Sequence, residues 1–156
     1  MTSGTLWLLL NFQLSFQLAK LTTDHIYFQI RNYKKAELDS KGVHAVAQEI
    51  IQRLELDKNP VHISFDIDAL DPPLAPSTGT KVPEGLSVED VVHIFKEIKK
   101  TGNLVSCDIV EFNPLIGSEN DVETTISSIS PVLKEILWKF MFLESDDIFV
   151  MRIEIL

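Results

Sequence analysis

The sequence predicts an α/β fold built around a parallel β-sheet. Short apolar, β-branched runs alternate along the chain with stretches whose apolar residues recur at helical spacing. This is the order of elements expected when helices cover a parallel sheet. The run 61–67 is apolar on both faces in places, as in a strand that is covered on both sides. A helical stretch separates it from the run 104–111, which together make a βαβ unit with a right-handed crossover.

The first part of the chain contains two expected strands and one expected helix. Residues 12–18 alternate between apolar and polar side chains, which is typical of a strand with one buried face. Residues 26–30 form a β-branched and aromatic run that also predicts a strand. Because apolar residues recur at intervals of three and four over 43–56, we expect a helix there, with Asp39 or Ser40 as its N-cap.

The middle of the chain is expected to form a long loop followed by a capped helix. Residues 68–86 hold four prolines and two glycines, which predicts an irregular but ordered connection. Ser87 begins the next helix, with Asp90 three residues later as the second half of a capping box. Gly102 is suited to end this helix, and residues 104–111 then form a strand.

Two more elements are expected near the end. Apolar residues at helical spacing predict a helix reaching about residue 140. Pro131 must either kink this helix or stand in its first turn, after Ser130 as the cap. Residues 146–156 are expected to add one more strand.

Composition limits the class of protein and of partner. With 156 residues, 45% hydrophobic and 24% charged, the chain has the size and make-up of one globular domain. A net charge of −9 disfavours nucleic-acid binding, because the chain would repel a phosphate backbone. The single cysteine, Cys107, cannot form an internal disulfide and is expected to be a buried thiol in a reducing compartment. We therefore expect the cytoplasm, with the mitochondrion as the alternative.

The apolar run 6–10 raises the question of a signal peptide or a membrane segment. No Lys or Arg precedes it, and polar residues interrupt the apolar character from Asn11 onward. It also falls short of the roughly 20 apolar residues that a membrane-spanning helix needs. We expect a β-segment and no membrane partner.

Two carboxylates, Asp66 and Asp68, stand at the end of the run 61–67. Residues two apart in a strand point to the same side, roughly 6.6 Å apart along it. Both carboxylates are therefore expected on one face at the strand's carboxyl end, where open α/β sheets bind ligands. Carboxylates this close raise each other's pKa unless a cation neutralises them, so the spacing predicts a metal site.

The Asp-x-Asp pattern has three other interpretations. It can begin a solvated loop and cap the next turn. A calcium-binding EF-hand fails, because its ligand and glycine positions hold Leu70, Ser77 and Asp71. A haloacid-dehalogenase-like phosphatase also has Asp-x-Asp after an apolar strand, but its motif usually continues with Gly-Thr, and this chain has Ala69 and Leu70 there.

A longer pattern extends the comparison. Residues 64–72 read Ser-Phe-Asp-Ile-Asp-Ala-Leu-Asp-Pro, followed by Ala-Pro-Ser-Thr-Gly-Thr at 75–80, Gly-Leu at 85–86 and Asp-Ile-Val-Glu-Phe-Asn-Pro at 108–114. These segments resemble the carboxyl-terminal signature of the arginase/agmatinase ureohydrolases. The resemblance extends over residues 26–138 and implies a partial three-layer, parallel-sheet, arginase-like fold. Residues 1–25 and 139–156 are interpreted as divergent segments at the two ends.

The resemblance implies a hydrolase with two Mn²⁺ ions. Asp66 and Asp68 would supply carboxylate oxygens, hard ligands suited to Mn²⁺. Two bridged ions lower the pKa of a shared water, whose attack on the guanidinium carbon of a small substrate releases urea. Glu111 matches the family's guanidinium-binding glutamate and Thr80 a threonine near it, with a surface charge and a turn-stabilising hydroxyl as the structural alternatives. Asp71 is expected to shape the turn before the prolines.

Part of the family's site has no counterpart in this sequence. The family also uses an upstream histidine ligand, an Asp-x-His-x-Asp motif and a histidine that shuttles protons, and none of the four histidines stands in such a motif. His62 is expected to be a satisfied core histidine and His93 a packing or surface residue. We interpret the chain as a fragment, truncated variant or misassembled gene product of an arginase-like enzyme. We expect it to bind Mn²⁺ weakly and not to turn over arginine alone.

Substrate and assembly have alternatives. Glu-Phe-Asn-Pro at 111–114 favours arginase over agmatinase, although Lys81 and Glu84 stand where relatives more often have Pro and Gly. A second hypothesis is a non-catalytic paralogue that associates through exposed sheet edges. The family forms homo-oligomers, which makes such association plausible.

Overall fold

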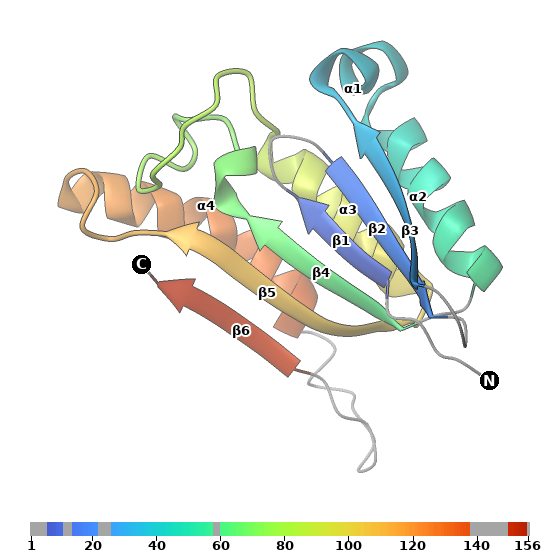
Figure 1. Ribbon diagram of the computed structural model, residues 1–156. Helices are drawn as coiled ribbons and strands as arrows, with labels where there is room; N and C mark the ends of the chain where they lie inside the picture. Colours follow the sequence, from blue (N-terminus) through green and yellow to red (C-terminus); the bar gives the residue numbers. More distant parts are fainter. Residues whose placement is uncertain (1–5, 11–13, 22–25, 58–59, 138–149, 156) are drawn as a thin grey trace.

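The computed structural model describes residues 6–10, 14–21, 26–57, 60–137 and 150–155 (Figure 1). Its strands form one six-stranded sheet in the order β3-β2-β1-β4-β5-β6. The strands are β1 (Leu6–Leu10), β2 (Leu14–Leu21), β3 (Ile26–Tyr33), β4 (Val61–Asp66), β5 (Leu104–Phe112) and β6 (Val150–Ile155). The helices are α1 (Lys35–Lys41), α2 (Val43–Asp57), α3 (Val88–Lys100) and α4 (Glu119–Leu137), with a 3-10 turn, η1, at Ile67–Ala69.

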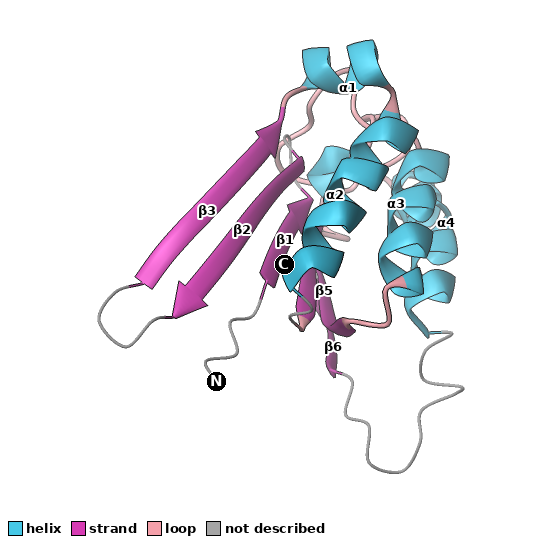
Figure 2. Cartoon of the chain, turned by 90° about the vertical axis from the view of Figure 1, so that its right-hand side faces the viewer, coloured by secondary structure: helices cyan, strands magenta, loops and turns pink. Residues whose placement is uncertain are grey.

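The sheet has a parallel part and an antiparallel part. β1, β4, β5 and β6 run parallel to one another, whereas β2 pairs with β1 and β3 pairs with β2 in antiparallel orientation. The described helices all lie on one face of the sheet (Figure 2). The expected α/β class and parallel sheet are confirmed, with the antiparallel pair β2 and β3 added at one edge.

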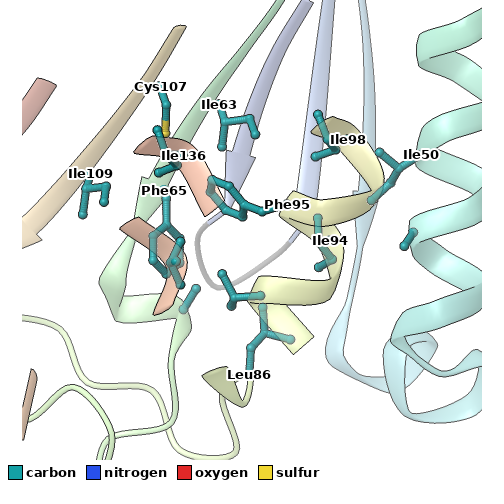
Figure 3. Packing of buried hydrophobic residues seen from close by; sticks show 14 of the residues in the cluster. Ile50, Ile63, Phe65, Leu86, Ile94, Phe95, Ile98, Cys107, Ile109 and Ile136 are labelled. Carbon is teal, nitrogen blue, oxygen red and sulfur yellow. The ribbon is translucent and has the colours of Figure 1, made fainter. Parts of the chain in front are cut away.

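Apolar packing between the sheet and the helices makes the core. In β4, Val61, Ile63 and Phe65 are buried and alternate with partly exposed neighbours, so among the described residues one face of the strand lies against helices, whereas the sequence predicted cover on both faces. Figure 3 shows Ile63 and Phe65 close to Phe95 of α3, and the ring centroids of Phe65 and Phe95 lie 5.9 Å apart, edge to face. Such an aromatic pair adds about 1 kcal/mol beyond its buried area.

Cys107 belongs to the same core. Its side chain is 1% exposed, and burial raises the pKa of its thiol. A thiol in this environment stays protonated and unreactive. The expected buried thiol is confirmed.

The region before α2 differs from the expectation. Asp39 and Ser40 do not cap a helix but lie within α1, a separate short helix, so the expected N-cap was wrong. Gly42 divides the two helices: its φ is +80° and its N–H donates to the carbonyl of Leu38 at 2.7 Å. A positive φ is easily adopted by glycine, and this turn lets α2 begin in a new direction.

The two later helices begin with paired caps. Ser87 and Asp90 form the reciprocal capping box that was expected for α3. At α4, Asp121 accepts from the backbone N–H of Ser118 at 2.7 Å, and the Ser118 hydroxyl accepts from the Asp121 N–H at 3.3 Å. The helix therefore begins earlier than apolar spacing alone indicated, because polar groups fix its first turn.

Pro131 lies inside α4, so the alternative in which it occupied the first turn was wrong. The helix continues to Leu137, and Ser130 donates its hydroxyl to the carbonyl of Ile126 at 2.7 Å. The strands expected at 26–30 and 104–111 are confirmed as β3 and β5. Those expected at 12–18 and 146–156 are confirmed over their described residues as β2 and β6. No described helix is long and apolar enough to cross a membrane.

Candidate metal and substrate site

Asp66 and Asp68 lie at the carboxyl end of β4, but not in one continuous strand. β4 ends at Asp66, and Asp68 belongs to the 3-10 turn that follows. The carboxylate of Asp66 accepts a hydrogen bond from the backbone N–H of Asp68 at 2.9 Å. The expectation that strand alternation places both side chains was therefore wrong, because the turn brings them together instead. Asp66 does cap this turn, as the structural alternative proposed, yet that role leaves the buried Asp68 unexplained.

Burial and mutual repulsion dominate the electrostatics of these carboxylates. Asp68 is 3% exposed, and burial, then Asp66, then Glu111 raise its pKa to about 6, while the Thr80 backbone N–H acts in the opposite direction. Burial also raises the pKa of Asp66, with Glu111 adding to the rise and the Asp68 N–H opposing it. Three carboxyl groups thus influence one another in a partly desolvated place, where a cation would relieve their repulsion.

Glu111 stands beside this pair, near the end of the neighbouring strand. In the register of β4 and β5, Asp66 lies opposite Val110, the residue before Glu111. Because these strands are parallel, their carboxyl ends meet at the same edge of the sheet, as Figure 1 shows for the ends of β4 and β5. Glu111 has φ +69°, a left-handed conformation that is uncommon for residues other than glycine. The structure therefore brings Glu111 to the two aspartates.

The loop after η1 contributes Thr80 and Asp71. Thr80 is exposed, and its backbone N–H, not its hydroxyl, is the group that acts on Asp68. Asp71 holds the loop: its carboxylate accepts from the Gly85 N–H at 3.1 Å and its own N–H donates to the Leu86 carbonyl at 3.1 Å. This matches the expected turn-forming role for Asp71.

Three buried hydroxyls hold the loop against β5 and α4, and sequence reasoning gave them no role. Ser77, Thr78 and Thr125 are 0%, 2% and 0% exposed. The Ser77 N–H donates to the Thr125 hydroxyl at 3.0 Å, and the Ser77 hydroxyl donates to the Ile116 carbonyl at 2.9 Å. Ser77 and Thr78 stand in the family-like signature, but nothing in the local sequence points to Thr125 as their partner.

The histidines that the structure describes do not complete a metal centre with the aspartates. His62 faces β5, with Nδ1 2.7 Å from the Ser106 hydroxyl and Nε2 3.3 Å from Asp108, as expected for a satisfied core histidine. His93 packs against His44, with ring centroids 3.9 Å apart, as expected for a packing residue. Within the described residues, no group of three His, Cys, Asp or Glu side chains could hold a metal ion.

Asp66 and Asp68 nevertheless suit a hard divalent cation as part of a larger ligand set. Their donor atoms are carboxylate oxygens, which Mn²⁺ and Mg²⁺ prefer. No described Lys or Arg forms an ion pair with either side chain. The donors fit a metal, and their number is that of a partial site.

Comparison with known proteins decides the family. The sequence model of the Arginase family matches residues 17–138, which include both aspartates, Glu111 and the loop between them. This chain belongs to the arginase family. Arginase from Schizosaccharomyces pombe is 34% identical over 109 residues, which are 69% of this chain and 34% of that protein. Rat mitochondrial arginase-2 is 42% identical over 102 residues, 64% of this chain and 29% of that protein.

A solved structure supports the same family. Arginase from Bacillus caldovelox is 30% identical with a TM-score of 0.56, over 65% of this chain and 34% of that chain. The chain therefore spans about a third of the length of the arginases it matches. Membership of the arginase family also favours the ureohydrolase interpretation of Asp-x-Asp over the phosphatase interpretation.

Proposed function

We propose that this chain carries the carboxyl-terminal part of an arginase-type site, which hydrolyses the guanidinium group of L-arginine to urea and ornithine. The supporting observation is that Asp66, Asp68 and Glu111 meet at the adjacent carboxyl ends of β4 and β5, where burial, and after it the charge of Glu111, raises the pKa values of the two aspartates. Asp66 and Asp68 would hold Mn²⁺ through their carboxylate oxygens. When bound, the metal would supply an activated water at neutral pH.

The roles of the chain's own residues follow from charge and position. A guanidinium is a permanent planar cation with several N–H donors, and a carboxylate is its natural partner. Glu111 is the carboxylate in this cluster that lies near the end of β5 and outside the Asp66–Asp68 turn. It would orient the guanidinium, and Thr80, whose backbone acts on Asp68, would contact the substrate with its exposed side chain.

The Asn113 side chain, part of the pattern that favours arginine, has a structural role. Its oxygen accepts the Leu115 N–H at 2.9 Å and so shapes the turn. That role is compatible with agmatine or another guanidino compound as substrate. Urea release should therefore be measured with arginine and agmatine side by side.

The test of the proposed function is Mn²⁺ binding and urea release by the 156-residue chain. We expect weak Mn²⁺ binding, measured by the loss of the free-ion EPR signal, and no urea release. Asp66→Asn and Asp68→Asn should each weaken binding at least ~10-fold, the lower limit for loss of even an indirect metal contact. Asp71→Asn is the matched control, because Asp71 holds the loop rather than the cluster, and should bind like wild type.

Two results would contradict this proposal. Equal Mn²⁺ affinity in wild type and Asp68→Asn would remove the metal role of the turn. Urea release that depends on Asp66 in the purified chain would refute the inactivity of the chain alone.

A second candidate is a non-catalytic association module. β6 is an outer strand of the described sheet, and its Val150 and Ile153 are 59% and 41% exposed. An outer strand with exposed apolar side chains is a template for pairing with another chain. Sedimentation equilibrium should then show self-association that Ile153→Lys abolishes, whereas a wild-type monomer at all concentrations would exclude pairing through this edge.

A further inference from the structure

Thr78 lies between Asp68 and Glu111. Its hydroxyl contacts the carboxylate of Asp68 and lies 3.0 Å from the backbone carbonyl of Glu111. The residue is 2% exposed, so water does not compete for these contacts. A single buried side chain thus joins the turn after β4 to the end of β5.

The backbone of Glu111 has an unfavourable conformation that its contacts must stabilise. Its left-handed backbone, with φ +69°, is a conformation that persists only where surrounding contacts hold it. The Thr78 hydroxyl is aimed at the Glu111 carbonyl, and the Asn113 N–H donates to the carbonyl of Ser77 at 3.0 Å. The loop therefore holds the backbone at Glu111 and two residues after it.

Hydrogen bonds between the loop and α4 hold Thr78 in place. Ser77, its neighbour, is bonded through its N–H to Thr125 of α4, and the Thr125 hydroxyl donates to the carbonyl of Asp121 at 2.9 Å. Each group in this chain of hydrogen bonds is buried or part-buried, so a break would leave an unsatisfied polar group. Threonine is also β-branched and has restricted χ1 rotation, which keeps its hydroxyl in one direction.

We propose that Thr78 is a positioning residue that sets the Asp68 carboxylate and Glu111 in one fixed relation. The proposal rests on the proposed function, in which Asp68 holds metal and Glu111 holds the guanidinium. A hydroxyl bonded to a ligating carboxylate orients its lone pairs and limits its rotation before a cation arrives. Because a hydroxyl has one proton, the Thr78 O–H is shared between the Asp68 carboxylate and the Glu111 backbone carbonyl, so a change at Thr78 disturbs both groups at once.

The experiment uses the 156-residue chain and a series graded by hydrogen-bond donor strength. Thr78→Ser keeps the hydroxyl, Thr78→Cys substitutes a weak donor, and Thr78→Val removes the donor while keeping the shape. Mn²⁺ affinity should stay near wild type in Thr78→Ser and fall ~10- to 100-fold in Thr78→Val, with Thr78→Cys between them. Thr101→Val is the matched control, because the Thr101 hydroxyl donates to the Ile98 carbonyl at 2.7 Å at the far end of α3.

A second readout needs no metal. In NMR spectra of the metal-free chain, Thr78→Val should shift both the Asp68 carboxylate carbon and the Glu111 amide, and Thr101→Val should shift neither. If wild type binds no Mn²⁺, the proposed function fails, while these shifts still decide the role of Thr78. Should Thr78→Val fail to fold, the comparison of Thr78→Cys with Thr78→Ser decides it.

The proposal is overturned by either of two results. One is Mn²⁺ affinity that does not follow donor strength through the series although wild type binds the ion. The other is a set of spectra in which only one of Asp68 and Glu111 responds to the loss of the hydroxyl.

Discussion

Replacing Asp68 by Asn should stabilise the metal-free chain at neutral and higher pH. Asp68 is 3% exposed, and its pKa is raised from 3.8 to about 6 by burial first and then by Asp66 and Glu111. In the unfolded chain the same carboxyl ionises near 3.8. Folding above pH 6 therefore places an ionised carboxylate where its charge is disfavoured, and this destabilises the folded state.

The magnitude follows from the shift. At 1.36 kcal/mol per pH unit, it corresponds to about 3 kcal/mol of unfolding free energy. Part of the repulsion relaxes when Asp66 or Glu111 moves or binds a proton, so we expect about 1 to 3 kcal/mol. The effect is absent below about pH 4, where both states are protonated, grows through the interval up to about pH 6, and is complete above it.

Asparagine is the suitable replacement because it keeps the shape and one oxygen. That oxygen can still accept from the Thr78 hydroxyl and the Thr80 N–H, so the charge is the main change. Urea unfolding followed by circular dichroism, in EDTA at pH 4 and pH 8, measures the difference. Asp71→Ala, which loses the bond from the Gly85 N–H, should instead lose about 1 kcal/mol at pH 8.

The reasoning is refuted if Asp68→Asn is no more stable than wild type at pH 8 while Asp71→Ala loses stability as expected. It is also refuted if the gain is equally large at pH 4, because most of a charge effect must be lost at a pH so close to the unfolded-state pKa of 3.8.

Two further predictions concern the loop and the helices. Gly85→Ala should destabilise the chain by about 1 to 3 kcal/mol in urea unfolding, because a Cβ there would lie 2.5 Å from the backbone N of Asp71. Gly79→Ala is the control: a Cβ there would meet nothing within 4 Å, so the free energy of unfolding should change by less than about 0.5 kcal/mol. Burial, then His44, lowers the pKa of His93. Stability from its neutral form is therefore present above pH 6.5 and lost as the pH falls toward the folded-state value. His93→Gln should flatten the melting temperature between about pH 7 and pH 5, and an unchanged slope would contradict this cause.

The sequence could predict elements whose signals are local. The capping box of Ser87 and Asp90 lies within four residues, and the residue types of both halves are enough to indicate it. The division at Gly42 was not predicted, because glycine near a helix start is compatible both with a weak first turn and with a break. The break occurs because residues 35–41 form a helix of their own, α1. Within α1, Lys41 forms an ion pair with Glu37, one turn away, at 2.9 Å.

The sequence predicted the acidic residues of the candidate site but not the buried hydroxyl groups that hold the loop around it. Asp66, Asp68 and Glu111 each follow an apolar run, and parallel strands bring such ends to one edge. The reason given for the first two was wrong, since a 3-10 turn rather than strand alternation joins them. Thr125 escaped prediction because its partner Ser77 lies 48 residues away, and no local pattern encodes a contact that depends on how α4 packs.

The apolar core and the acidic cluster therefore contribute differently: the core stabilises the fold, whereas the cluster serves the proposed metal binding. The helix-covered face of the sheet is held by apolar packing around Phe65 and Phe95, to which the acidic cluster adds nothing. The cluster itself opposes folding through Asp68, as charged functional sites often do. Removing the charge of Asp68 should then stabilise the chain and weaken Mn²⁺ binding, whereas removing the Thr78 hydroxyl should weaken both, because a buried hydrogen bond is lost with the orientation it provides. Both variants should bind Mn²⁺ more weakly, but loss of the Asp68 charge should raise the free energy of unfolding and loss of the Thr78 hydroxyl should lower it. This difference would show that Asp68 serves metal binding at a cost in stability, whereas Thr78 serves the structure around it.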